Sequence, residues 1–78
     1  MKPVVTEKAV RLIETNNTLV VEVSRKMNKK QIKQEFEEIF KGEIEKMNVN
    51  IRKNKKYAYI KLKQKTPAID IATKFGLI

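Results

Sequence analysis

The sequence predicts an α+β domain in the order β-α-β-α-β-β-α, in which helices cover at least one face of a mostly antiparallel sheet. Three observations predict this fold. Apolar residues alternate along 18–24, 43–52 and 56–63, as in half-buried strands. Apolar residues recur at helical spacing along 7–15, 29–41 and the C-terminal segment. With 78 residues, two glycines and two prolines, the chain has room for one domain, 1–78, and few flexible linkers.

The N-terminal segment predicts a short extended piece followed by a helix. Pro3-Val4-Val5 favours extended backbone because valine is β-branched. Thr6 is a good N-cap, and a helix from Glu7 to Thr15 follows, with the acid in the first turn where the helix dipole favours an anion. Asn16-Asn17 ends this helix.

The next strand and helix are predicted from the spacing of apolar residues, which changes from strand alternation to helical spacing. Thr18–Ser24 alternates, so that Leu19, Val21 and Val23 point to one side. Asn28 then caps a second helix, Lys29–Lys41, which Gly42 stops. The apolar stripe of this helix consists of Ile32, Phe36, Ile39 and Phe40.

Two strands, Glu43–Arg52 and Lys56–Lys63, form a predicted hairpin. Its tip is Lys53-Asn54-Lys55, in which Asn54 tolerates a positive φ. Ile44 is out of phase with the later apolar residues of its strand, which predicts a bulge or twist near Glu45-Lys46.

The C-terminal helix is predicted from its cap and its inner face. Thr66 is the expected cap, Pro67 takes the first helical position, and Gly76 stops the helix. The inner face consists of Ala68, Ile71, Ala72 and Phe75.

Composition excludes most chemistry and indicates a polyanionic partner. The chain has 18 Lys and Arg residues and nine Asp and Glu residues, which gives a net charge of +9. Such a charge favours a polyanionic partner, because neutralising its phosphates releases bound counterions. The chain has no His and no Cys, hence no imidazole base, thiolate or disulfide, and a cytosolic protein is expected. Glycines at 42 and 76 alone allow no glycine-rich phosphate loop. There is neither a long apolar run for a membrane helix nor an apolar stretch long enough for a signal peptide.

Thirteen of the eighteen cations lie in two stretches, 25–33 and 46–65, that contain no acid, so nothing near them in sequence neutralises them. Strand alternation places Tyr57, Tyr59, Lys61 and Lys63 on the side away from the core, together with Asn48, Asn50 and Arg52. Lysines suit phosphates, and tyrosines stack on unpaired bases. Lysines at the start of the second helix disfavour the isolated helix but suit a nearby phosphate. The predicted RNA contacts are Lys29, Lys30, Lys33, Arg52, Lys53, Asn54, Lys55, Lys56, Tyr57, Lys61 and Lys63.

Several short motifs resemble one known family. Pro3-Val4-Val5-Thr6-Glu7-Lys8-Ala9 resembles the opening motif of the large-subunit ribosomal protein numbered twenty-three, found at the rim of the nascent-peptide exit tunnel. Asn17-Thr18-Leu19, Met47-Asn48 and the start of the second helix at Asn28 follow in register. Residues 56–62 are similar to the late signature of the family, although Tyr57 interrupts it, and 71–77 resembles the archaeal tail.

The resemblance implies a four-stranded antiparallel sheet, no enzymatic activity and no cofactor. It also implies large-subunit ribosomal RNA and neighbouring ribosomal proteins as partners, and a cytoplasmic location in the large ribosomal subunit. Signal recognition particle, nascent-chain chaperones and the translocon are implied to dock on a surface that includes Glu7, whose alternative role is a first-turn helix acid. The chain has neither the long tunnel hairpin of bacterial members nor the basic extension of eukaryotic ones, so it resembles the archaeal type.

Two other functions stay open from the residues alone. Size and charge suit a small DNA-binding or chromatin protein equally well, although no recognition helix stands out. An enzyme or enzyme subunit is least favoured, because it would depend on carboxylates or lysines without partners. We also expect the crowded cations of the hairpin tip to keep it mobile until RNA binds.

Overall fold

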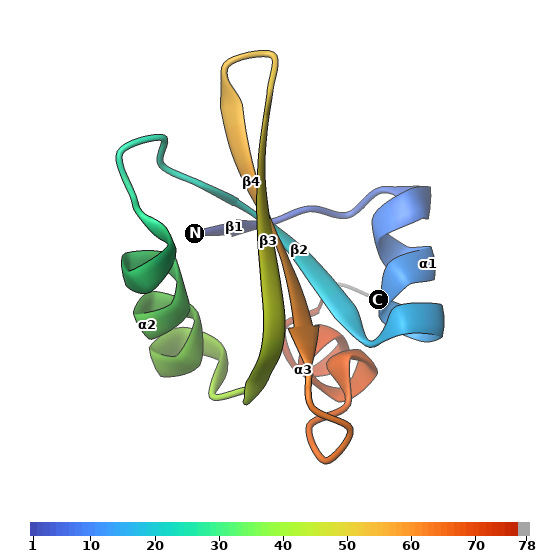
Figure 1. The fold of residues 1–78 in the computed structure, drawn as a ribbon. Coiled ribbons are helices and arrows are strands. Elements are labelled where there is room, and N and C mark those ends of the chain that lie inside the picture. Colours follow the sequence, from blue (N-terminus) through green and yellow to red (C-terminus); the bar gives the residue numbers. More distant parts are fainter. Residues whose placement is uncertain (77–78) are drawn as a thin grey trace.

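The computed structural model describes residues 1–76, and a four-stranded sheet organises them (Figure 1). The strand order is β1-β2-β4-β3, and every neighbouring pair is antiparallel. This is the predicted fold class and element order. The elements are β1 Lys2–Pro3, α1 Glu7–Asn16, β2 Thr18–Val23, α2 Lys29–Phe40, β3 Ile44–Arg52, β4 Lys55–Leu62 and α3 Ala68–Lys74.

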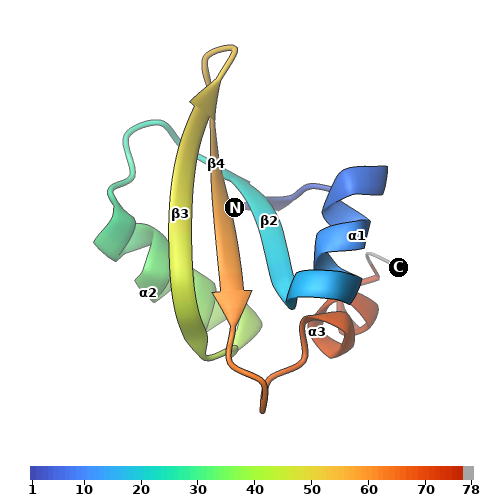
Figure 2. The same ribbon diagram turned by 45° about the vertical axis from the view of Figure 1, so that its right-hand side comes forward.

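One side of the sheet faces the core with α2 and α3. On the other, which we call the open side, α1 covers part of β2 and leaves the rest of the surface uncovered. The core holds the inward residues of β2 together with Ala58, Ile60 and Leu62, which alternate along β4. Ile32, Phe36 and Phe40 of α2 and three residues of α3 pack against them. Ile39, which was predicted in the apolar stripe of α2, is 42% exposed and lies outside the core. The helix α1 lies beside β2, away from α2, and its lower end contacts α3 (Figures 1 and 2). The side chains with less than 2% exposure are Phe36, Leu19, Ile32, Ile60, Leu62 and Val21.

The N-terminal segment behaves as predicted, with a small shift of the strand. Lys2–Pro3 pairs with Val21 and Glu22, and the Val4 N–H donates to the Val20 carbonyl at 2.9 Å. The helix α1 begins with the Thr6 hydroxyl accepting from the Ala9 N–H at 3.1 Å. Extended backbone therefore leads into a capped helix, one residue longer than expected.

The end of α2 corrects one prediction. The left-handed residue that closes the helix is Lys41, with φ of 54°, and not Gly42. Gly42 is needed for space, because a Cβ there would lie 2.9 Å from Ile71 Cδ1 and 3.2 Å from Leu62 Cδ2. The glycine thus lets α3 pack against the base of β4.

The β3–β4 hairpin has a shorter tip than predicted and the predicted bulge. Lys53 and Asn54 alone form the turn, with φ of 51° and 65°, which is the two-residue geometry that matches the strand twist. At the other end, Ile44 pairs with Leu62 and the next pair joins residues 46 and 61, so residue 45 is the extra one.

The start of α3 differs from the prediction, because Thr66 does not cap it. Pro67 occupies the cap position and makes no side-chain bond to the helix. The Asn17 side chain, from the left-handed residue that ends α1, accepts the Ala68 N–H instead. Its amide also donates to three carbonyls of the β4–α3 connection, those of Leu62, Lys63 and Thr66, at 3.0, 3.2 and 3.4 Å.

The inner face of α3 is three residues rather than four. Ala68, Ile71 and Ala72 are buried, whereas Phe75 is 43% exposed, although its ring meets Phe40 edge-on at 4.8 Å between centroids. Gly76 has the positive φ of a helix stop, and Leu77 lies outside the described residues. None of the helices in 1–76 combines the length and the apolar character that crossing a bilayer requires.

Candidate nucleic-acid interface

The hairpin tip presents cations on both sides of a tight turn. Arg52 pairs with Lys55 across the turn formed by Lys53 and Asn54, and these four side chains are all exposed. A type I′-like turn holds the flanking strands together up to its two central residues. The charges of the tip are therefore carried by regular, paired backbone.

Lys56 differs from its neighbours because it points to the core side of the sheet. It is half-buried, and its ammonium donates to the carbonyl of Met27. This bond fixes the loop before α2 against the hairpin, at the same end of the molecule (Figure 1). Arg25 and Lys26 of that loop, which the prediction omitted, join the predicted basic residues there.

The first turn of α2 is capped by uncharged side chains, which leaves its lysines exposed. The Asn28 side chain accepts the Gln31 N–H at 2.8 Å, and the Gln31 side chain accepts the Asn28 N–H at 3.0 Å. Lys29 and Lys30 are exposed on this turn, where the helix dipole is positive and no acid is present, and Lys33 is exposed at the start of the next turn. Cation and dipole thus have the same sign, a combination that an anion would stabilise.

The cations of the hairpin tip, of the loop before α2 and of the start of α2 are together called the basic end. No ion pair of the described residues includes any of them. The elements that supply them are far apart in sequence, and the Lys56–Met27 bond joins those elements. The basic end consists of Arg25, Lys26, Lys29, Lys30, Lys33, Arg52, Lys53, Lys55 and Lys56.

The cations at the base of the hairpin are compensated, which corrects the expectation drawn from their acid-free stretch. Lys61 Nζ lies 3.9 Å from a carboxylate oxygen of Glu45, and Lys65 Nζ lies 3.1 Å from one of Glu43. The bulge contributes to this compensation. Lys61 pairs with Lys46 across the strands, and the extra residue of the bulge, Glu45, places a carboxylate beside these two lysines. Each ion pair joins residues that are far apart in the sequence, so neither could be predicted from the charge pattern.

The open side of the sheet gathers the other predicted polar residues as expected. Val20, Tyr59 and Asn48 form one row across β2, β4 and β3, and Tyr57 stands between Glu22 and Asn50 in the next row. Lys56 and the start of α2 lie on the opposite side of this sheet. The predicted contacts therefore fall on two surfaces that meet at the hairpin tip, and Lys63 lies beyond the base of β4.

Glu7 is separate from all of these residues. It lies in the first turn of α1, and its side chain is 92% exposed. Among the described residues its ion-pair partner is Arg11 of the same helix, at 3.7 Å. An exposed pair of this type contributes little to stability, so the acid is available to a partner.

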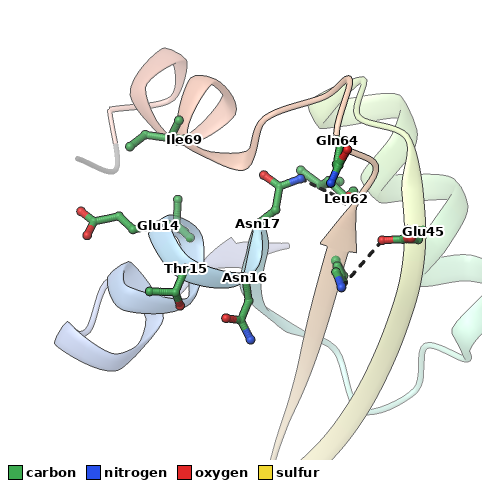
Figure 3. A pocket seen from close by; sticks show the side chains of 10 residues that line it. Glu14, Thr15, Asn16, Asn17, Glu45, Leu62, Gln64 and Ile69 are labelled. Carbon is green, nitrogen blue, oxygen red and sulfur yellow. Dashed lines mark hydrogen bonds and ion pairs between the residues drawn. The ribbon is translucent and has the colours of Figure 1, made fainter.

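A pocket of about 700 Å³ lies between the end of α1 and the base of the hairpin (Figure 3). Asn17 points across it toward Leu62, and the dashed Lys61–Glu45 pair borders it. Its charged residues are Glu14 and that same pair, with no arrangement of nucleophile and base. Residues 1–76 also hold no group of three acids placed for a metal ion. The pocket therefore offers no catalytic constellation.

Comparison with known proteins gives one consistent result. The model of the family described as ribosomal protein L23 matches residues 1–73. The chain is 45% identical over 78 residues to the large ribosomal subunit protein uL23 of Methanothermobacter thermautotrophicus, covering 99% of this chain and 91% of the relative. It is 42% identical over 76 residues to the protein of the same name from Methanococcus vannielii, covering 96% and 88%.

Proposed function

The chain belongs to the ribosomal protein L23 family, and we propose that this structural component of the large ribosomal subunit binds large-subunit ribosomal RNA through its basic end. Membership makes it a cytoplasmic, non-enzymatic ribosomal protein whose similar relatives are archaeal. The observation that carries the RNA proposal is the set of nine cations of the basic end, which have no ion-pair partner among residues 1–76. Like charges gathered in this way repel one another, and a bound polyanion would relieve that repulsion.

The basic end and the open side of the sheet, which meet at the hairpin tip, make different contacts with the RNA. Lysines of the tip and of α2 neutralise phosphates, which positions the protein without reading sequence. The open sheet side adds tyrosines and asparagines, which suit bases and 2′-hydroxyls. Lys56 is the exception among the predicted contacts, because its ammonium already serves the Met27 carbonyl. Its role is to hold the loop and the tip together.

A double variant tests the basic end. Lys53→Ala with Lys55→Ala should weaken binding to protein-free large-subunit ribosomal RNA and reduce the slope of log K against log salt by about one per lost phosphate contact. Both side chains are exposed, so the fold should persist. The control is Lys65→Ala with Lys74→Ala, which removes equal charge outside the basic end. Equal loss in both variants would show that net charge, and not this surface, sets binding.

We also propose that the exposed start of α1 is a docking surface near the exit tunnel for factors that meet nascent chains. Glu7 supports this, since it is almost fully exposed and its ion pair is local. The candidate factors are signal recognition particle, nascent-chain chaperones and the translocon.

Ribosomes carrying Glu7→Lys should bind purified signal recognition particle more weakly than wild-type ribosomes, as measured by co-sedimentation. Glu14→Lys, another exposed acid of α1, is the matched control. Equal binding by all three would remove Glu7 from the docking surface.

A further inference from the structure

The two tyrosines of the open sheet side have ring faces that no aromatic neighbour uses. The ring contacts among residues 1–76 join phenylalanines, Phe36 with Phe40 and Phe40 with Phe75. Tyr57 and Tyr59 are both half-buried on β4. Both side chains are therefore partly accessible to solvent.

The helix α1 turns this part of the sheet into a groove of about 160 Å³. Ala9 and Leu12 of α1 line one side, and Val20 and the two tyrosines line the sheet side. Two cations, Lys8 and Arg52, line the same groove from different elements. None of the described residues that line it is an acid. Glu22, the nearest acid in the strand register, stands opposite Tyr57 outside the lining.

We propose that this groove holds one unpaired base of ribosomal RNA, stacked on Tyr59, with Lys8 and Arg52 against the flanking phosphates. An apolar wall facing an aromatic ring accepts a flat π surface, and unpaired RNA bases are commonly bound in this way. The cations match the backbone on either side of such a base. This inference rests on the proposed RNA-binding function and adds a nucleotide site to it.

The test compares two substitutions of Tyr59, with protein-free large-subunit ribosomal RNA from Methanothermobacter thermautotrophicus as the probe. Tyr59→Leu keeps an apolar side chain but removes the ring, and it should raise Kd by about 5- to 150-fold, the range of one stacked base. Tyr59→Phe keeps the ring and should bind with wild-type affinity. Neither variant changes charge, so the salt slope should stay constant.

A second variant keeps the test independent of how Tyr59→Leu folds. Leu12→Phe narrows the groove from α1 and leaves Tyr59 in place, so it should weaken binding as Tyr59→Leu does. Thermal unfolding of each variant checks that the protein is folded under the binding conditions.

Three results would overturn the nucleotide site: wild-type affinity for Tyr59→Leu, equal weakening by Tyr59→Leu and Tyr59→Phe, or wild-type affinity for Leu12→Phe. Failure of the proposed function looks different. In that case the wild-type protein itself would bind the RNA without dependence on salt, or the Lys53→Ala, Lys55→Ala variant would bind unchanged.

Discussion

The two ends of the β3–β4 hairpin are built for different purposes. At the base, Asn17 bonds to the chain leaving β4, Gly42 lets α3 pack closely, and Glu43 and Glu45 pair with lysines. At the tip, cations flank a two-residue turn without any ion pair of the described residues. Stability therefore resides mainly at the base, and the capacity to bind a polyanion resides at the tip. Substitutions at the two ends should separate these properties.

The largest expected effect is at Asn17. Asn17→Gly keeps the left-handed backbone but removes every side-chain hydrogen bond to the β4–α3 connection, which should cost about 2–3 kcal/mol of unfolding free energy. Asn17→Ala should cost about 1 kcal/mol more, because alanine is strained at positive φ. Urea denaturation measures both values.

A matched control lies at the tip. Asn54 also has a positive φ, 65°, and its side chain makes none of the hydrogen bonds found among the described residues. Asn54→Ala should therefore cost only the backbone strain of about 1 kcal/mol. If Asn17→Gly and Asn54→Ala cost the same, the base does not depend on the Asn17 bonds.

Gly42 should show the next largest effect. A methyl group there meets side chains of Ile71 and Leu62, so Gly42→Ala should destabilise the protein by about 1–2 kcal/mol through overpacking. Gly76 is the contrasting position, since a Cβ there meets no atom within 4 Å and only its positive φ of 71° opposes alanine. Gly42→Ala with Ile71→Val should recover part of the loss, whereas Gly76→Ala with Ile71→Val should not. Thermal unfolding distinguishes these outcomes.

The sequence was sufficient for features that depend on near neighbours. The Thr6 and Asn28 caps, the bulge at Glu45 and the inward faces of β2 and β4 all follow from local chemistry or from period. Two of the errors share one cause. Thr66 was expected to cap α3, but the side chain of Asn17 accepts the Ala68 N–H instead. Gly42 was expected to end α2, but it is needed because a side chain there would collide with Ile71 of α3. Each depends on a contact distant in sequence, which single-residue preferences do not contain.

The interface was predictable as a set of residue types but not as a surface. Counting cations found the two basic stretches, and alternation found the open side of the sheet. Sequence could not show that Lys56 joins those stretches by bonding to Met27, because 29 positions separate them. For the same reason it missed the acids that compensate Lys61 and Lys65, and the place of Lys8 beside the tyrosines.

A smaller effect should follow from improving the turn itself. Asn54→Gly gives the second turn position the residue that type I′ hairpins prefer, and it should stabilise the protein by about 0.5 kcal/mol. Part of the gain is offset by the greater freedom of glycine in the unfolded chain. The charge is unchanged, so the RNA salt slope should not move. Unchanged stability in urea would indicate that the free protein does not form this turn, as expected of a tip ordered only by RNA.

The smallest effect on stability is expected at Glu45. This residue also gives the sharpest test of whether RNA binding is confined to the tip of the hairpin and stability to its base. Its pair with Lys61 is half-exposed at 3.9 Å, so Glu45→Gln should cost no more than about 0.5 kcal/mol, and less at high salt. The variant leaves Lys61 opposite Lys46 without compensation. If Lys61 contacts a phosphate, as predicted from sequence, the RNA salt slope should steepen, by up to about one. Glu43→Gln frees Lys65, which is not a predicted contact, and should leave the slope unchanged. Unchanged slopes in both variants would remove Lys61 from the interface and confine phosphate binding to the basic end.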